Sequence, residues 1–169
     1  VESLLERGAV VIALDIDPKI TDLFNNQNIL GLVCDVCDAD AVRQCVEQGI
    51  SHFGGLDIMI SNAGIFPASQ TIAEMDNYTW KASLDINLTS HQQLLSLCIP
   101  YLRNGLDPAV VIIGSKNVPA PGPGASAYSA AKAGLNQLVR IAAMELAADG
   151  IRVNTVHPNA VFDTAIWTD

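Results

Sequence analysis

Short apolar runs alternate with longer segments of helical period along this chain, and this alternation limits the fold more than any other feature of the sequence. Strands that are separated by helices form parallel sheets with helices on both faces. We therefore predict an α/β protein with a doubly wound parallel sheet, as a single domain over residues 1–169. The predicted strands are residues 9–15, 29–34, 57–62, 109–115 and 151–157. The predicted helices are a short segment that ends at Gly8, then residues 39–53, 76–103 and 126–149.

Charge and hydropathy narrow the partners that the protein can have. The chain carries 18 acidic and 9 basic residues, for a net charge of -9. Without a basic stripe it cannot neutralise many phosphates, so we expect no nucleic-acid partner. The longest apolar run, residues 9–14, is far shorter than the roughly 20 residues that span a bilayer, and no secretory signal is visible. We expect a small-molecule partner, no membrane association and a cytoplasmic location.

The cysteines and histidines allow two interpretations. Cys34 and Cys37 form a C-x-x-C motif ahead of a predicted helix, where a redox pair lowers a thiol pKa. However, no second such pair or nearby histidine completes a zinc site, so we favour reduced cysteines that act as small buried apolar residues. The histidines follow no ligand spacing, and we predict no metal site. They are His52, His91 and His157.

An irregular segment, residues 116–126, separates a predicted strand from a predicted helix. Its alternating prolines and glycines neither extend a strand nor begin a helix early, so it is predicted to be a loop. In open parallel sheets, ligands bind beyond the carboxyl ends of strands. A plain connecting loop and a ligand-binding loop both fit this composition.

Tyr128 and Lys132 stand four residues apart in the helix that follows the loop. Side chains with this spacing lie on one face of a helix, so the ammonium group is expected near the phenol. A nearby positive charge favours the phenolate, which makes the tyrosine a candidate proton donor and acceptor. Small residues around the pair, such as Ala127 and Ala131, are expected to leave room for a flat ligand.

Several other polar residues follow predicted strands or interrupt a predicted helix. Ser115 ends a strand, and Asn87 lies inside a helix although an amide has low helix propensity. With the pair Tyr128 and Lys132, these residues make the sequence resemble the short-chain dehydrogenase/reductase family over nearly its whole length. The matching motifs, in order, are Asp15, "CDV" at 34–36, "NAG" at 62–64, Asn87, Ser115, "YSAAK" at 128–132 and "RVNTVHP" at 152–158.

The resemblance implies a Rossmann-type fold and a nicotinamide-dependent oxidoreductase. It implies that Tyr128 exchanges a proton with the substrate oxygen, and that Lys132 lowers the pKa of Tyr128 and holds the nicotinamide ribose. Ser115 would orient the substrate carbonyl, and Asn87 would hold a water in the proton relay. The cofactor-binding residues implied in addition to Tyr128 and Lys132 are Asp15, Asp35, Val36, Asn62, Ala63, Gly64, Pro158 and Val161.

Asp15 indicates which nicotinamide cofactor to expect. A carboxylate at the end of this strand accepts hydrogen bonds from the adenosine ribose and repels a 2′-phosphate. The neighbouring Ile16, Asp17 and Pro18 supply no arginine to offset that repulsion. We therefore predict NAD rather than NADP.

The sequence also departs from the family pattern. It holds no G-x-x-x-G-x-G loop of the kind whose backbone N–H groups cradle a pyrophosphate. We expect the family's first strand with its Gly-rich loop, and its C-terminal strand and helix, to be absent from these 169 residues. The chain is accordingly expected to be part of a larger polypeptide. A threonine at position 164 falls one place later than the family pattern has it.

The tail, residues 157–169, resembles the dehydrogenase half of bifunctional aldolase/short-chain dehydrogenases of rhamnose breakdown. That resemblance implies a small hydroxy-aldehyde such as lactaldehyde as the substrate. The resemblance to the short-chain dehydrogenase/reductase family implies a homodimer or homotetramer that is formed through the helices 76–103 and 126–149. The alternatives are a catalytically silent Rossmann scaffold that acts in assembly, and an epimerase or dehydratase of nucleotide sugars.

Overall fold

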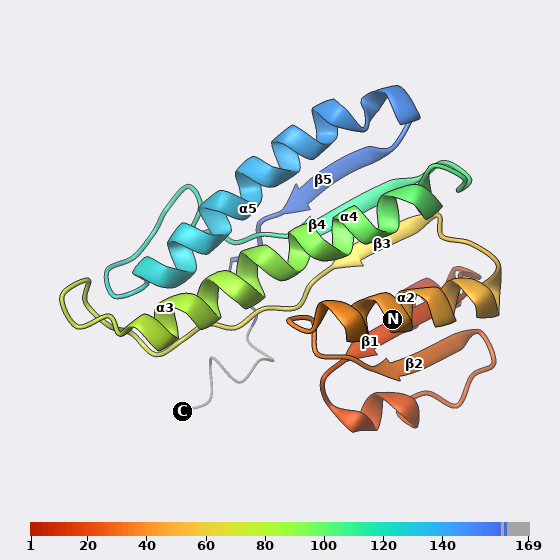
Figure 1. Cartoon of the computed structure of the whole chain (residues 1–169), viewed down its shortest axis with the longest axis horizontal. Coiled ribbons are helices and arrows are strands. Elements are labelled where there is room, and N and C mark those ends of the chain that lie inside the picture. Colours follow the sequence, from red (N-terminus) through yellow and green to blue (C-terminus); the bar gives the residue numbers. More distant parts are fainter. Residues whose placement is uncertain (160, 162–169) are drawn as a thin grey trace. The chain divides into compact units, whose positions relative to one another are not determined.

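The computed structural model describes residues 1–159 and 161, and the chain divides into two compact units, Val1–Leu56 and Asp57–Asp169. Both units are built from parallel strands and helices (Figure 1). All the strand pairs among the described residues are parallel, which confirms the predicted α/β class. The prediction of one domain over 1–169 stays a prediction.

The N-terminal unit is a two-stranded parallel sheet with helices. Strands β1 and β2 pair from Val11↔Ile29 to Asp15↔Val33. Because this register is parallel, Asp15 and the residues after Val33 lie at the same end of the sheet. Its elements are α1 (Glu2–Glu6), β1 (Val11–Asp15), a 3₁₀ helix (Pro18–Thr21), β2 (Ile29–Val33) and α2 (Ala39–Phe53).

Helix α2 packs closely against β1 because one of its inward positions is a glycine. A Cβ atom at Gly49 would lie 2.4 Å from the Ile12 Cδ1 atom, a distance that packed atoms do not reach. Val42, Cys45 and Val46 are buried on the same helix. The apolar residues whose spacing predicted this helix are therefore the residues that face the sheet.

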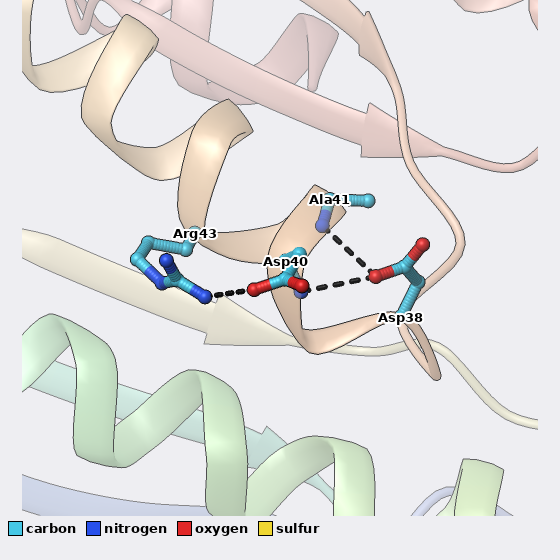
Figure 2. Close-up of polar contacts among 4 residues, drawn as sticks. All are labelled: Asp38, Asp40, Ala41 and Arg43. Atoms are coloured by element: carbon cyan, nitrogen blue, oxygen red, sulfur yellow. Dashed lines mark hydrogen bonds and ion pairs between the residues drawn. The ribbon is translucent and has the colours of Figure 1, made fainter.

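The first turn of α2 is capped by Asp38. One carboxylate oxygen accepts hydrogen bonds from the backbone N–H groups of Asp40 at 3.0 Å and Ala41 at 3.1 Å (Figure 2). Arg43 pairs with the Asp40 carboxylate on the same turn. These bonds satisfy backbone donors that have no partner inside the helix, so residue 38 fixes where the helix begins.

Replacing Asp38 with Ala is expected to lower the free energy of unfolding by about 1 kcal/mol, because the Asp40 and Ala41 N–H groups lose their acceptor. The measurement is the urea midpoint of the full-length protein. Asp38→Asn, whose amide oxygen can still accept these bonds, is the matched control and should stay close to wild type. Equal destabilisation by both substitutions would contradict the capping explanation.

The C-terminal unit has a three-stranded parallel sheet in the order β3-β4-β5. Helix α4 packs on β3 and α5 packs on β5. Leu102, Val110, Ile112 and Leu135 are fully buried between these layers. The elements are β3 (Ile58–Ser61), α3 (Asn77–Leu84), a π-helical segment (Asp85–Thr89), α4 (Ser90–Leu102), β4 (Ala109–Ile113), α5 (Ser126–Glu145), a 3₁₀ helix (Ala147–Asp149) and β5 (Arg152–Val156).

Several predicted boundaries need correction. β1 begins at Val11 rather than at 9, β3 covers Ile58–Ser61 rather than 57–62, and β5 covers Arg152–Val156 rather than 151–157. The segment predicted as one helix over 76–103 is helical from 77 to 102 but contains the π-helical segment. Helix α5 ends at Glu145 rather than at 149, and a 3₁₀ turn closes on Gly150, whose φ of 72° is left-handed. Strand β4 ends at Ile113, two residues before Ser115, because the Ser115 backbone N–H donates to the His157 ring instead of to a strand carbonyl.

Each unit also has a strand with one unpaired edge. Among the described residues β1 pairs only with β2, and β3 pairs only with β4. Both edges present backbone N–H and C=O groups that a strand could bind.

Candidate active site

The π-helical segment places Asn87 in the interior of the C-terminal unit. Its side chain is fully buried, its Oδ1 atom accepts a hydrogen bond from the Ile65 N–H at 3.0 Å, and its Nδ2 atom donates to the Ile65 carbonyl at 3.0 Å and to Ser83 Oγ at 3.2 Å. A single π turn inside an α-helix is a frequent feature of functional sites. The amide therefore ties the segment that follows β3 to the wide turn of the helix.

Gly64 brings Asn87 and Lys132 together. A Cβ atom at this glycine would lie 2.9 Å from Asn87 Oδ1 and 3.6 Å from Lys132 Nζ. Any side chain at position 64 would displace the Asn87 amide and contact the ammonium group. The "NAG" motif, Asn62–Gly64, thus begins directly after β3 and runs beside two of the predicted catalytic residues.

Lys132 is buried although it carries an ammonium group. It is 3% exposed, and Nζ donates to the Ile113 carbonyl at 2.9 Å. Burial lowers the pKa of Lys132 from 10.5 to about 8, because the charged form loses its hydration. An ammonium group has three N–H donors, and the Ile113 carbonyl accepts one of them.

Tyr128 lies one turn before Lys132 on α5, as the spacing predicted. The Lys132 Nζ atom is 5.9 Å from the centroid of the Tyr128 ring. The Phe66 ring packs against the Tyr128 ring, with centroids 4.7 Å apart and planes inclined by 59°. Of the small residues that were expected to leave room for a ligand, Ala127 and Ala131 are fully buried in the packing of α5, whereas Ala130 and Ala133 are exposed.

Ser115 is buried in the turn that follows β4. Its Oγ atom accepts a hydrogen bond from the Asn117 N–H at 3.1 Å, and Asn117 Nδ2 donates to Ser129 Oγ at 3.3 Å. The backbone of Ser115 also contacts His157, with Nδ1 at 3.1 Å from its nitrogen and 2.9 Å from its oxygen. Asn117 therefore links the turn that carries Ser115 to the helix that carries Tyr128.

Residues 116–125 form a loop, as predicted except that Ser126 already belongs to α5, and a second segment holds this loop. The Gln70 N–H donates to the Gly124 carbonyl at 3.0 Å, and Gln70 forms an isolated parallel bridge with Ala125. Gly124 has a left-handed φ of 79°, and a Cβ atom there would collide with Ser69 Oγ. The loop after Ser115 is thereby fixed to the segment after the "NAG" motif.

The predicted adenosine-binding residues lie together in the N-terminal unit. Asp15 ends β1, and its backbone carbonyl accepts from the Cys34 N–H at 2.8 Å, which brings Asp35 and Val36 to the same end of the sheet. Both carboxylates are exposed. One oxygen of Asp15 accepts from the Asp17 N–H, and one oxygen of Asp35 accepts from the Cys37 N–H, each at 2.9 Å. Each carboxylate keeps a second oxygen for a ligand.

The remaining predicted cofactor residues follow β5. The Pro158 carbonyl accepts from the Lys116 N–H at 3.0 Å, which joins this segment to the loop after Ser115. Val161 is half exposed. Thr164 and most of the tail that carried the aldolase resemblance, residues 160 and 162–169, lie outside the described residues.

The cysteines are reduced in the structure, and one of them differs from the prediction. Cys34, Cys45 and Cys98 are buried, but Cys37 is exposed. Burial, followed by the neighbouring Cys45 thiol, raises the pKa of Cys34 to about 12, so this thiol is unreactive at neutral pH. Within residues 1–159 and 161 no cluster of His, Cys, Asp and Glu could hold a metal ion.

One polar pair was not predicted from the sequence, and it consists of His91 and of Ser61, the residue directly before the "NAG" motif. The Ser61 Oγ atom and the His91 Nδ1 atom are 2.6 Å apart, and both residues are buried. Burial first, and then the positive charge of Lys132, lower the pKa of His91 to about 4, and the Ala63 backbone opposes this shift. His91 lies among the polar residues of the first turn of α4, so the sequence holds no signal for this contact.

Comparison with known proteins matches the sequence to one family. The family model described as short chain dehydrogenase matches residues 1–169. The chain is 32% identical to cis-4-hydroxycyclohexanecarboxylate dehydrogenase of Sinomonas cyclohexanicum, over 92% of this chain and 64% of that protein. It is 31% identical to human dehydrogenase/reductase SDR family member 4, over 84% of this chain and 52% of that protein. The chain thus spans half to two thirds of the length of these relatives.

Solved structures agree with the fold. An NADPH-bound short chain oxidoreductase of Pseudomonas aeruginosa, described as having an atypical catalytic center, superposes with a TM-score of 0.91 at 32% identity. That superposition covers 98% of this chain and 67% of the other. An NADH complex of 3-ketoacyl-(acyl-carrier-protein) reductase from Brucella melitensis, 24% identical, covers 92% of this chain and 67% of the other with a TM-score of 0.88, and supports the fold alone. No helix in the described part of the chain is long and apolar enough to cross a membrane.

Proposed function

The chain belongs to the short chain dehydrogenase family, and from this premise we propose that the full-length protein transfers a hydride between NAD and a small alcohol, hydroxy-aldehyde or ketone. The observation that carries the proposal is the buried ammonium group of Lys132, one helical turn from Tyr128 and beside the amide of Asn87. A scaffold without catalysis gains nothing from burying this charge, because burial destabilises the charged form.

The residues of the site fit a nicotinamide cofactor by their donors and acceptors. Lys132 Nζ has two N–H groups beyond the one that the Ile113 carbonyl accepts, and these suit the hydroxyls of a ribose. The Asp15 carboxylate has a second oxygen that suits the adenosine ribose. When bound, the cofactor supplies the hydride chemistry.

The protein's own side chains then handle the proton. We assign to Tyr128 the transfer of the proton to and from the substrate oxygen, and to Lys132 the stabilisation of the phenolate that this leaves. Ser115 orients the substrate oxygen from the turn after β4. Asn87 forms hydrogen bonds with Ile65 and Ser83, and these bonds hold the π-helical segment beside the proton-transfer residues. The lactaldehyde-like substrate, implied by the tail, is the first compound to test.

The test of this function is NADH formation by the full-length protein with short hydroxy-aldehydes, polyols and secondary alcohols. We expect turnover with at least one of these compounds and a preference for NAD over NADP. No turnover with any of them, in either direction and with either cofactor, would contradict the proposed activity.

Asp15→Ala is expected to weaken the preference for NAD, because the variant loses both the ribose acceptor and the repulsion of a 2′-phosphate. We expect the ratio of kcat/KM for NAD over NADP to fall about tenfold or more, since the loss of a charge-assisted hydrogen bond costs roughly 1.5–3 kcal/mol. Asp17→Ala is the neighbouring control and should leave the ratio unchanged. A ratio that Asp15→Ala does not move would exclude Asp15 from cofactor selection.

We further propose assembly as a homodimer or homotetramer through the helices 76–103 and 126–149, and a cytoplasmic location. Ile141 and Met144 of α5 support the first proposal, because they are 40% and 69% exposed in the single chain. Light scattering of the full-length protein measures the assembly state.

A further inference from the structure

Behind the "NAG" motif, the side chain of His91 is enclosed in the C-terminal unit. His91 is the second residue of α4 and is 1% exposed, and Ser61 is the last residue of β3 and is 4% exposed. Their hydrogen bond of 2.6 Å is short for a bond between a nitrogen and an oxygen atom. Because no solvent reaches either side chain, this pair is not a nucleophile and base that act on a substrate.

The position of the pair connects it with the candidate active site. Ser61 directly precedes Asn62–Gly64, and the His91 ring interacts with the Ala63 backbone as well as with Ser61. Lys132 is close enough that its charge acts on the ring. The imidazole therefore contacts the first and third residues of the four-residue turn Ser61–Gly64, from the side of α4.

The ring stays neutral and is incompletely bonded. Its Nε2 atom has no hydrogen-bond partner among the described residues, although it is buried. An unpaired buried nitrogen costs free energy that an apolar side chain of similar size would avoid. Packing alone would thus be better served by Leu, which indicates that the imidazole is kept for its hydrogen bond to Ser61.

We propose that His91 is a positioning residue that holds the Ser61–Gly64 turn in the conformation that binds the nicotinamide cofactor. The proposal rests on the proposed function, in which Asn62, Ala63 and Gly64 line the cofactor. His91 does not touch the cofactor, and it acts through Ser61 and the Ala63 backbone. Loss of its hydrogen bond lets the turn move and lowers cofactor affinity without removing a proton-transfer group.

The test is a double-mutant cycle of His91→Leu and Ser61→Ala in the full-length protein. Each single variant is expected to raise the KM for NAD about tenfold, with kcat changed by less than about threefold, because uniform binding is lost. The double variant should be no worse than the worse single variant, since the two side chains share one bond. His91→Asn, whose amide can still bond Ser61, should recover most of the affinity.

Ser90→Ala is the matched control. Ser90 is also buried, but its hydroxyl bonds only the Ile86 carbonyl of its own helix, at 2.7 Å. This variant should keep the wild-type KM for NAD. If His91→Leu does not fold, Ser61→Ala and His91→Asn decide the question.

The outcomes separate the two proposals. The affinity for NAD is measured by calorimetry in addition to turnover. If the wild type binds NAD but shows no turnover, the proposed hydride transfer is contradicted, and the role of His91 can still be tested through the affinity. Wild-type values of KM and Kd for NAD in both Ser61→Ala and His91→Leu would overturn the positioning role. An equal fall of kcat and of thermal stability, with KM for NAD unchanged, would also overturn it. Failure of the wild type to bind either nicotinamide cofactor would overturn both proposals.

Discussion

Tyr128→Phe is expected to lower kcat/KM of the full-length protein by about 10²–10⁴-fold, the usual contribution of a positioned general acid or base. The substitution removes one hydroxyl from a half-buried ring whose packing against Phe66 does not involve that oxygen. We therefore expect the thermal unfolding midpoint and the affinity for NAD to stay close to wild type. Steady-state kinetics with the best substrate of the panel measures the effect.

Tyr78→Phe is the control for this experiment. Tyr78 lies on α3 and is 82% exposed, so the loss of its hydroxyl should change neither turnover nor stability. If Tyr128→Phe keeps wild-type turnover, another group must carry the proton. The roles that we assign to Ser115, Lys132 and Asn87 would then have no support, because all of them depend on proton transfer by Tyr128.

The strands and the helix over 39–53 could be predicted from the sequence because the spacing of their apolar residues matches the positions that are buried when these elements pack. Helix α2 begins and ends where predicted, since Asp38 caps its first turn and Gly54, with a φ of 89°, ends its last. β2 ends one residue before its predicted end at residue 34, and β4 ends two residues before its predicted end at residue 115. At β2 the apolar run continues through Cys34, and at β4 the residues beyond the strand are Gly114 and Ser115, so period alone does not locate a strand end.

The π-helical segment could not be located from the hydrophobic pattern, because it adds one residue to a turn without interrupting the helix. Asn87 was the only signal, as a short amide at a position with no propensity reason for it. The structure supplies that reason, since the amide accepts a hydrogen bond from the Ile65 N–H and donates one to the Ile65 carbonyl. A polar residue that breaks local propensity was in this case a better guide to the site than the helix pattern.

His91 escaped sequence reasoning for a different physical reason. Its role depends on contact with Ser61, 30 residues earlier in the chain, and neither side chain has a spacing or motif that marks the contact. By contrast, Tyr128 and Lys132 are four residues apart on one helix, so helix geometry alone predicted their common face. Local pairs can be read from a sequence, whereas pairs between a strand end and a helix need the fold.

Lys132→Met is expected to abolish most turnover and yet to stabilise the protein at neutral pH. Turnover should fall about 10²–10³-fold, as when a single donor that stabilises developing charge is removed. Stability should rise because the wild type holds a buried ammonium group, whose pKa is lowered from 10.5 to about 8. At about 1.4 kcal/mol per pKa unit, this charge destabilises the folded state by about 3 kcal/mol. The Ile113 carbonyl loses its donor in the variant, so we expect a net gain of about 1–2 kcal/mol.

The pH dependence separates this explanation from a simple gain in packing. Between pH 8 and 10.5 the unfolded wild type still binds the lysine proton and the folded wild type does not, so its stability rises with pH across this window. Lys132→Met lacks that rise, and its advantage over the wild type should shrink from pH 7 to pH 10.5. Lys81→Met, at an exposed position of α3, should follow the wild type throughout. Urea unfolding of the cofactor-free protein at several pH values measures the difference, and a constant advantage at every pH would show that the buried charge is not its cause.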